Sequence, residues 1–462
     1  MDSRALYLDT KPGRLFLKAA GPGAVSMLAS SLYQIFDSIF VGKFIGTTAF
    51  AALGLAFPLI IINFALSDLV GIGSSVPISI MLGQKDDENA NNYFTCACLW
   101  VVVTGLFSGT LMYLLAPAYM RMMGASGQLL AVGVRYIRIY ALFSLFVPIL
   151  YSLDNFLRVA GRPNVSMWLN VAMTVGTVIL ESVLILGLDM GIDGAAIGAC
   201  SAMSISVIIG MSMFARGRMQ MKFVRPRFSR QMLGQIYKNG FPVFLTNVAG
   251  RVFSMVINVL LLRFGGEGAV AVYGLAIVVC SLVEMLLYGV IDSLQPALGY
   301  NYGAGMTDRV KAIQKYVMMG GLLISLVGGG LIVLLPRQMA TPFLEDLSLL
   351  PLAVDVLRIS CVAYLFKWLS QSIQSLFMAL ERPLPSMIIS VCNVSVFPLL
   401  LIPVLLPWEL TGIWWNFPIT SLLTTALAVI LLVIYRKKLF SPLKRGKKYR
   451  RTDYERCPFL CH

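Results

Sequence analysis

The chain has 462 residues, of which 58% are hydrophobic and only 13% are charged, and its mean hydropathy is +0.80. A soluble protein of this length carries about 25% charged residues and has no core large enough for so many apolar side chains. Apolar stretches of about 20 residues or more recur along the chain, each long enough to cross a bilayer. These stretches are continuous rather than alternating, so we predict an all-α polytopic membrane protein rather than a barrel.

Twelve membrane-spanning helices are predicted, centred near residues 30, 65, 105, 147, 177, 204, 252, 285, 325, 365, 394 and 424. Spans two and eight, at about 48–83 and 268–303, are long, and we expect them to tilt or kink. Six spans lie on each side of a basic loop. The predicted domains are an N-terminal lobe at 1–215, the loop at 216–238, a C-terminal lobe at 239–436 and a basic tail at 437–462.

The chain contains an internal repeat with an offset of about 220 residues. Residues 44–56 read FIGTTAFAALGLA and residues 264–276 read FGGEGAVAVYGLA, with 7 of 13 positions identical. The same offset relates Arg162-Pro163 to Arg382-Pro383. Because each copy has an even number of spans, we expect two six-helix lobes related by a pseudo-two-fold axis along the membrane normal. Such repeats commonly build alternating-access transporters.

The distribution of basic residues predicts the orientation. With the N-terminus in the cytoplasm, the cytoplasmic segments hold 28 Lys and Arg residues and the opposite loops hold four. The positive-inside rule therefore places both termini in the cytoplasm of a multi-pass protein of the cell membrane. It also accounts for the net charge of +15, because the basic loop and tail are suited to anionic lipid headgroups. No nucleic-acid partner is needed to explain this charge.

Cysteine and histidine give little support for metal or catalytic chemistry. The tail carries Cys457, Cys461 and His462, but a flexible end supplies neither a fourth ligand nor a fixed geometry, so no metal site is expected. His462 is the only histidine, and no serine or cysteine has a credible base. We predict neither enzymatic activity nor a bound cofactor.

Polar side chains form a stripe on two predicted helices of the N-terminal lobe. The first span carries Ser26, Ser30, Tyr33 and Asp37, and the fifth carries Asn170, Thr174, Thr177 and Glu181, both spaced by 4, 3 and 4 residues. Each set lies on one helix face that ends in an acid. The fourth span adds Tyr151, Asp154 and Asn155. We expect a shared hydrophilic chamber, because ionisable groups within a span normally face a cavity or a partner.

Asp37 and Glu181 are the candidate coupling acids. Two carboxylates close together at low dielectric constant do not both stay ionised, so either one holds a proton or a cation such as Na⁺ lies between them. The alternative is structural, with the acids paired to basic residues or accepting hydroxyl hydrogen bonds. Few basic residues lie deep within spans one to six. Asp154 precedes Arg158 by four residues, and we interpret it as structural.

The C-terminal lobe has a different set of charged residues. Arg251 lies within span seven, Glu284 and Asp292 within span eight, and Lys367 within span ten. We favour an internal ion pair of Arg251 with Glu284 or Asp292. Lys367, near Gln371 and Gln374, is a candidate for the lining of a substrate path.

Five motifs, in this order along the chain, make the sequence resemble the multidrug and toxic compound extrusion (MATE) family over about residues 15–436. They are DSIFVG at 37–42, LRVAGRP at 157–163, GIDGAA at 191–196, QPALGYNYGA at 295–304 and GIW at 412–414. The resemblance implies a V-shaped pair of six-helix lobes that expels small organic, often cationic, compounds in exchange for H⁺ or Na⁺. We also expect the protein to function as a monomer.

The DinF-like bacterial branch of this family keeps its essential acid in span one, which is Asp37 here. The cation site of related members falls on Asn155, Thr177, Glu181 and Ala199. The family's Asn in span four is kept as Asn155, and its Asp in span five is replaced by Glu181. Its Asn in span five and its Thr in span six are replaced by Thr177 and Ala199. These changes favour proton coupling over Na⁺. In the NorM-type branch the C-lobe acids fall on Gly250 and Gln371, so that site is absent.

The candidate residues thus fall into two groups. The cation-coupling candidates are Asp37, Glu181, Asn155 and Thr177, with Na⁺ as a possible occupant at Asp37 and Glu181. The substrate-path candidates are Tyr33, Ser30, Asn170, Thr174, Tyr151, Lys367 and Gln371. The runner-up function is a flippase of a lipid-linked precursor from the same superfamily, for which Arg251 and Lys367 supply basic residues. A structural or receptor role does not explain the two polar helix faces that each end in an acid.

Overall fold

The computed structural model describes residues 3–344 and 347–440, without the side chains of residues 33–35, 38, 39 and 438. Every regular element in these ranges is helical, which confirms the predicted all-α class. The predicted tail from residue 441 onward lies outside the described residues, as do Cys457, Cys461 and His462. The first repeat consists of η1 (Ala5–Asp9), α1 (Pro12–Phe40), η2 (Val41–Ile45), α2 (Thr47–Gly83), α3 (Asp87–Met122), α4 (Gly127–Leu142), α5 (Val147–Val159), α6 (Pro163–Ser182), η3 (Val183–Gly187) and α7 (Gly191–Ala215).

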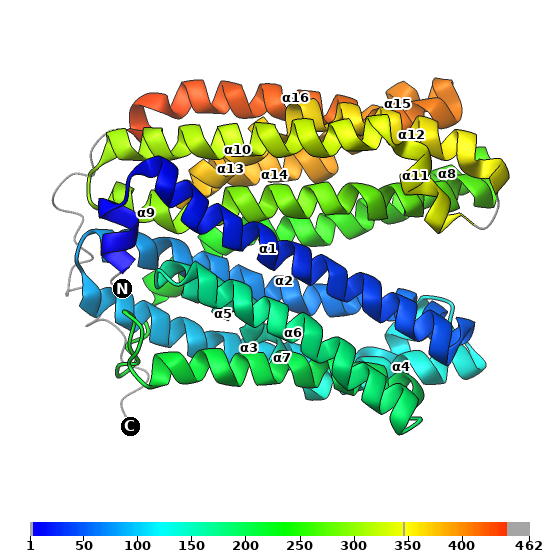
Figure 1. Ribbon diagram of the computed structural model, residues 1–462, viewed down its shortest axis with the longest axis horizontal. Helices are drawn as coiled ribbons and strands as arrows, with labels where there is room; N and C mark the ends of the chain where they lie inside the picture. The colour runs from blue at the N-terminus through cyan, green and yellow to red at the C-terminus, as the bar shows by residue number, and fades with distance from the viewer. Residues whose placement is uncertain (1–2, 345–346, 441–462) are drawn as a thin grey trace. The chain divides into compact units, whose positions relative to one another are not determined.

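The second repeat follows the loop between α7 and α8 (Figure 1). Its helices are α8 (Arg230–Asp292), α9 (Gln295–Gly303), α10 (Thr307–Leu334), α11 (Pro336–Ala340), η4 (Thr341–Phe343), η5 (Leu347–Leu349), α12 (Leu350–Val362), α13 (Tyr364–Ala379), α14 (Pro383–Val391), η6 (Cys392–Val396), α15 (Phe397–Leu405), η7 (Leu406–Trp408) and α16 (Glu409–Leu439).

The described helices provide the twelve predicted spans. Eight helical stretches are long and apolar enough to cross a membrane, and two bent pairs, α4 with α5 and α12 with α13, bring the number to ten. Two of the eight stretches are long enough to contain two spans each. The stretch Arg230–Gly303 breaks at Gly266, where φ is 65° and ψ is −164°, and the stretch Pro383–Lys437 breaks at Glu409, where φ is 48°. Dividing both at these breaks gives six spans in each repeat.

The repeat is present in the backbone as well as in the sequence. Helices α2 and α9 end at corresponding positions of the two copies, α3 and α10 begin at corresponding positions, and α6 and α14 each begin at the corresponding proline. Four further pairs of residues are related by the same offset, and both members of each pair have a positive φ. In three of these pairs at least one member is not glycine. The four pairs are Gly46 with Gly266, Lys85 with Gly305, Gly161 with Glu381, and Asp189 with Glu409. The offset therefore preserves the turn geometry even where it does not preserve the residue.

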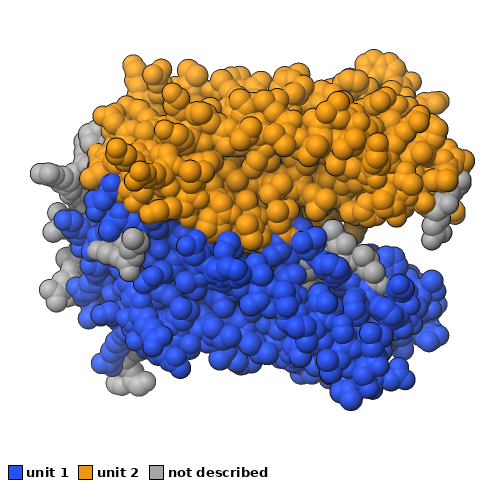
Figure 2. Space-filling view, viewed as in Figure 1, with its two compact units in different colours: residues 1–9, 29–244, 443–462 blue, residues 10–28, 245–442 orange. Residues whose placement is uncertain are grey.

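The described residues form two compact units (Figure 2). Each unit includes one segment from the other repeat. Of the described residues, unit 1 contains 3–9 and 29–244, and unit 2 contains 10–28, 245–344 and 347–440. The units therefore differ from the predicted lobes in two places. The first half of α1 belongs to unit 2, and the first turns of α8, up to residue 244, belong to unit 1.

Small residues allow the exchanged segments to pack closely within the unit that they join. In unit 2, a Cβ atom on Gly23 of α1 would overlap the carbonyl oxygen of Gly289. In unit 1, a Cβ atom on Gly240 of α8 would overlap the carbonyl oxygen of Leu69. Close backbone approach through small residues is a usual basis for helix association in membranes. The two exchanges use equivalent positions, because Leu69 and Gly289 are related by the offset of the sequence repeat.

Candidate functional site

Helices α1, α6 and α7 bring the two predicted coupling acids together inside unit 1. Asp37 of α1 is 1% exposed and Glu181 of α6 is fully buried, and their carboxyl groups face each other. Thr177 lies one turn before Glu181 and is also buried. Cys200 of α7 is buried beside both acids. The polar stripes of the first and fifth spans thus meet at their acidic ends.

A glycine on α7 permits this arrangement. A Cβ atom placed on Gly198 would lie 2.9 Å from both Cγ and the backbone nitrogen of Glu181. Real Cβ atoms essentially never approach other heavy atoms so closely. Helix α7 therefore packs directly on the residue that carries the second acid, and a larger residue at 198 requires Glu181 to move.

The acids have no cationic partner among the described residues. None of the ion pairs in this part of the chain includes Asp37 or Glu181. Apart from each other, their carboxyl oxygens have no hydrogen-bond partner there, and neither has Thr177 Oγ1. Burying an uncompensated charge is costly, and two such groups in contact increase the cost. The cluster is therefore chemically suited to take up a proton or to surround a small cation with oxygen atoms.

The remaining N-lobe candidates lie along the same helices but are engaged in other contacts. Thr174 Oγ1 donates hydrogen bonds to the carbonyl oxygen of Ala29 on α1 and to that of Asn170, both at 3.0 Å. Asn155 Nδ2 donates to the carbonyl oxygen of Tyr151 at 3.0 Å, within α5. The Tyr151 ring packs on Phe64, with centroids 4.8 Å apart. These contacts give Thr174 a clear role in joining α1 to α6.

The structure gives less information on two candidates of α1. Ser30 is half-buried. Tyr33 belongs to the helix, but its side chain lies outside the described residues.

A second buried polar cluster lies on α5 and α6. Asp154 forms an ion pair with Arg158, as the spacing of four residues predicted, and accepts hydrogen bonds from Ser166 and from Asn170 Nδ2, the latter at 2.9 Å. The Arg158 side chain is only 5% exposed. Asn170 therefore contacts Asp154 and not the Asp37–Glu181 pair. Asp154 is satisfied by its neighbours, in contrast to Asp37 and Glu181, the candidate coupling acids.

Sequence reasoning missed Asp68 of α2. This half-buried acid lies near Asp154, Arg158 and Tyr151 and interacts electrostatically with all three. A usable signal was present, since Asp68 is an isolated acid within a long apolar stretch, where ionisable residues usually have a function.

The segment before the first span is fixed to this second cluster. The Tyr7 hydroxyl donates a hydrogen bond to the carbonyl oxygen of Arg158. Burial raises the pKa of the Tyr7 phenol, so it keeps the proton that it donates. Arg4 binds the Asp87 carboxylate at 2.6 Å and the carbonyl oxygen of Leu82 at 3.0 Å.

Unit 2 contains an ion pair between Glu284 of α8 and Lys367 of α13. This corrects the expected pairing: an internal ion pair exists, but Lys367 and not Arg251 is the partner of Glu284. Among the described residues Arg251 has no carboxylate within ion-pair distance. Asp292 instead accepts a hydrogen bond from Gln295 Nε2 at 2.8 Å.

The Glu284–Lys367 pair lines a cavity of about 290 Å³ within unit 2. Aromatic residues form one wall, where the Tyr273 ring stacks on Phe417 with centroids 6.0 Å apart and lies 6.4 Å from Trp414. Trp414 is 4% exposed, and its Nε1 has no hydrogen-bond partner among the described residues. Gln371 is buried on α13 and is not part of the cavity lining.

The MatE family model matches the chain twice, at residues 22–183 and 242–404. Multidrug export protein MepA of Staphylococcus saprophyticus is 25% identical over 425 residues, which cover 90% of this chain and 93% of the relative. Its namesake in Staphylococcus aureus is 24% identical over 448 residues, with 95% and 97% covered.

Solved structures share the fold. A MATE protein in complex with MaL6 gives a TM-score of 0.88 at 21% identity, covering 95% of this chain and 98% of that one. A MOP superfamily transporter from Pyrococcus furiosus gives a TM-score of 0.89 at 21% identity, covering 95% and 99%. The starts of the two family matches are separated by the offset of the sequence repeat, and together the matches include more than half of the chain, so this protein belongs to the MatE family of membrane transporters.

Proposed function

We propose that the protein is a secondary active multidrug exporter that exchanges organic, cationic or amphipathic compounds for H⁺ or Na⁺ by alternating access. The observation that carries this proposal is the contact of Asp37 with Glu181, two buried acids without a cationic partner among the described residues. The names of the staphylococcal relatives, which are multidrug export proteins, support the cargo class.

The coupling step is assigned to this pair. When a proton or Na⁺ binds, the negative charge between α1 and α6 is reduced, and when it leaves, two carboxylates repel each other at low dielectric constant. The free energy of this change is available to bias one conformation over another. Thr177 adds one oxygen, but Ala199 adds none, so the oxygen set is smaller than a dedicated Na⁺ site requires. We therefore favour H⁺ as the coupling ion.

The cavity of unit 2 is proposed as part of the substrate path. Its aromatic wall suits planar apolar groups, and the Glu284 carboxylate suits a cationic centre. Lys367 competes for that carboxylate, so a cationic substrate has to displace it or bind beside it. Ser30, Tyr33 and Tyr151 of the first repeat, and Gln371 of the second, remain candidates for the same path.

The proposed orientation has both termini in the cytoplasm of a cell membrane, with the basic loop against anionic headgroups. We propose that one chain is sufficient for transport. The alternative, a flippase for a lipid-linked precursor, calls for a basic cavity that binds a pyrophosphate headgroup. The pairing of Lys367 with Glu284 argues against it, because one of the two basic residues is already neutralised.

The test is transport by the purified protein in liposomes, with a pH gradient and a Na⁺ gradient imposed separately and a panel of cationic dyes as cargo. We expect the pH gradient to drive dye transport and Asp37→Asn to abolish it. Glu88→Gln serves as the matched control, because it also removes an acid, but one that is 78% exposed in a surface ion pair. Dye transport by Asp37→Asn at the rate of the control would overturn the proposal.

A further inference from the structure

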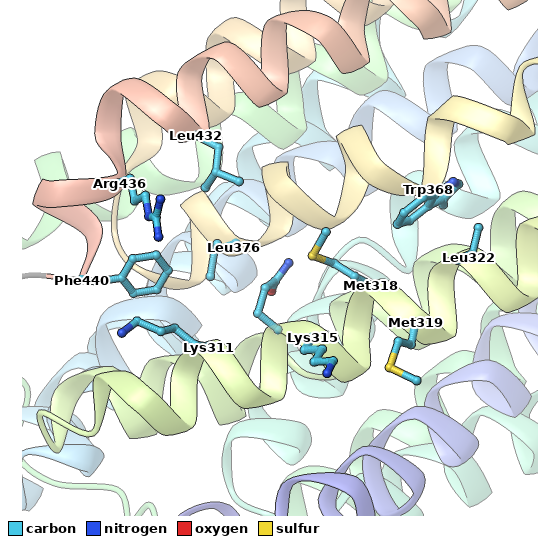
Figure 3. Close-up of a pocket in the computed structure, with 11 residues that line it drawn as sticks. Lys311, Lys315, Met318, Met319, Leu322, Trp368, Leu376, Leu432, Arg436 and Phe440 are labelled. Carbon is cyan, nitrogen blue, oxygen red and sulfur yellow. The ribbon is translucent and has the colours of Figure 1, made fainter.

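A groove of about 350 Å³ lies within unit 2 between α10, α13 and α16 (Figure 3). Lys311 of α10 and Arg436 of α16 lie at one end, on either side of the Phe440 ring. Leu322 and Trp368 lie at the other end, next to Met319. The groove therefore joins a basic end to an apolar one and is separate from the Glu284–Lys367 cavity.

The basic end has an excess of positive charge. Lys311, Lys315 and Arg436 all line the groove and are exposed. Lys311 pairs with Asp308 at 2.9 Å, an acid whose side chain is 94% exposed. Among the described residues, Lys315 and Arg436 have no carboxylate within ion-pair distance. Two of the three cations are thus available to bind an anion, and the third, Lys311, has a solvated carboxylate partner and also lies 5.4 Å from the centroid of the Phe440 ring.

A buried acceptor lies between the two ends. Gln314 lines the groove, is 6% exposed and donates from Nε2 to the carbonyl oxygen of Ser372 on α13 at 3.0 Å. Its Oε1 has no hydrogen-bond partner among the described residues. An amide oxygen in this state can accept a hydrogen bond from a hydroxyl group, and leaving a buried acceptor unsatisfied is unfavourable.

The groove, from its basic end to its apolar end, is about as long as the hydrocarbon part of one leaflet is thick. From Lys311 to Leu322 the rise along α10 is about 16 Å, at about 1.5 Å per residue. One leaflet of the hydrocarbon core is about 15 Å thick, half of the whole core. The outer face of α10 continues with exposed apolar residues such as Leu323 and Leu326, so this surface is suited to contact with lipid.

We propose that this groove binds one anionic phospholipid with a hydroxyl-bearing headgroup. Lys311, Lys315 and Arg436 hold the phosphate, Gln314 Oε1 accepts a headgroup hydroxyl, and one acyl chain lies along Met319, Leu322 and Trp368. Basic pockets between membrane helices are known to bind anionic headgroups in this way. The site goes beyond the proposed transport function and does not depend on the coupling ion or the cargo.

The test uses the full-length protein in detergent, titrated with phosphatidylglycerol or phosphatidylcholine, with bound lipid counted by native mass spectrometry. We compare the wild type with K311Q/K315Q/R436Q and with R216Q/R218Q/R225Q. The second variant removes the same charge from exposed loop residues that form no ion pair among the described residues. We expect K311Q/K315Q/R436Q to weaken phosphatidylglycerol binding by about a hundredfold, as three basic contacts predict.

Further measurements separate the possible occupants of the groove. Met319→Trp blocks the apolar end without a change of charge and should also reduce phosphatidylglycerol binding. Glycerol 3-phosphate at millimolar concentration should not displace the lipid, because it lacks the acyl chain. Equal binding of phosphatidylcholine, displacement by glycerol 3-phosphate, or an equal loss in the loop variant would each overturn the proposal. Gel filtration before each titration confirms that every variant is folded and monodisperse.

Discussion

The two repeats share helix boundaries and turn geometry, yet their buried charges are arranged in opposite ways. In the first repeat, Asp37 and Glu181 face each other without a cation among the described residues. In the second, Glu284 is neutralised by Lys367. At the positions of the second repeat that correspond to the two acids, the chain has isoleucine (257) and leucine (401). A duplicated framework can therefore carry a charge-changing site in one copy and a neutral ion pair in the other.

This difference indicates which repeat can respond to a change of protonation. An acid with a cation beside it already has its charge balanced, so it has less need of a coupling ion. An acid pair without a cation changes its total charge when a proton or Na⁺ binds. We therefore expect coupling to depend on the first repeat, and cargo recognition to be able to use the second.

The largest expected effect separates these two roles. Glu181→Gln should abolish dye transport in liposomes, because one acid alone no longer forces uptake of the coupling ion. The double variant E284Q/K367M changes two side chains but keeps the net charge of the site, and it should retain pH-driven transport of at least some dyes. Loss of all transport in the double variant, with Glu181→Gln still active, would reverse the comparison.

A second prediction concerns the stability of the ion pair in unit 2. Glu284→Gln alone leaves the Lys367 ammonium group partly buried without its partner. The two side chains are 33% and 22% exposed, so we expect a loss of about 2 kcal/mol, below the 3–5 kcal/mol of a fully buried pair. Thermal unfolding in detergent measures this loss of stability, and E284Q/K367M should recover most of it. No recovery in the double variant would show that the two residues act independently.

The glycine beside Glu181 gives a third, smaller effect. Gly198→Ala introduces a methyl group 2.9 Å from Glu181 Cγ, so α7 or the acid has to shift, at a cost of about 1–3 kcal/mol. Transport should fall because the carboxyl groups separate. Gly176→Ala on α6 is the matched control, since its added Cβ atom would lie 3.6 Å from Ala202, an ordinary contact. Equal losses in both variants would mean that general packing, rather than the acid pair, is responsible.

The smallest expected effect distinguishes the coupling ions. Thr177→Val keeps the shape of the residue and removes its hydroxyl. If H⁺ is the coupling ion, pH-driven transport should change little, because Thr177 Oγ1 has no hydrogen-bond partner among the described residues that the substitution could remove. If Na⁺ is bound, the concentration of Na⁺ needed for half-maximal transport should rise clearly. Comparison of the two gradients in the same liposomes provides the measurement.

The sequence was most informative where a contact is local or periodic. The spacing of Asp154 and Arg158 predicted their ion pair, and the hydrophobic pattern located all twelve spans. The polar stripes placed Asp37 and Glu181 on matching faces, because one helix turn sets that geometry. Contacts between distant helices were harder to predict, and Lys367 was not assigned to Glu284, from which it is far removed along the chain.

Other contacts could not be predicted from local patterns. Asp68 could be noticed as an isolated acid, but its neighbours Asp154 and Arg158 come from another helix. The exchange of residues 10–28 and 230–244 between the units was invisible as well. A repeat shows that two segments are equivalent, but equivalence does not determine which copy each segment packs against.

The exchange of segments between the two units has a consequence for a chain expressed as two separate halves. If the gene were cut within the loop between α7 and α8, each product would lack a helical segment that its own compact unit needs and would carry one that belongs to the other. Neither half should accumulate alone, whereas co-expressed halves should complement each other and copurify without a covalent link. The glycine contacts of Gly23 and Gly240 would then hold two polypeptides together, so each half would act as the folding template of the other.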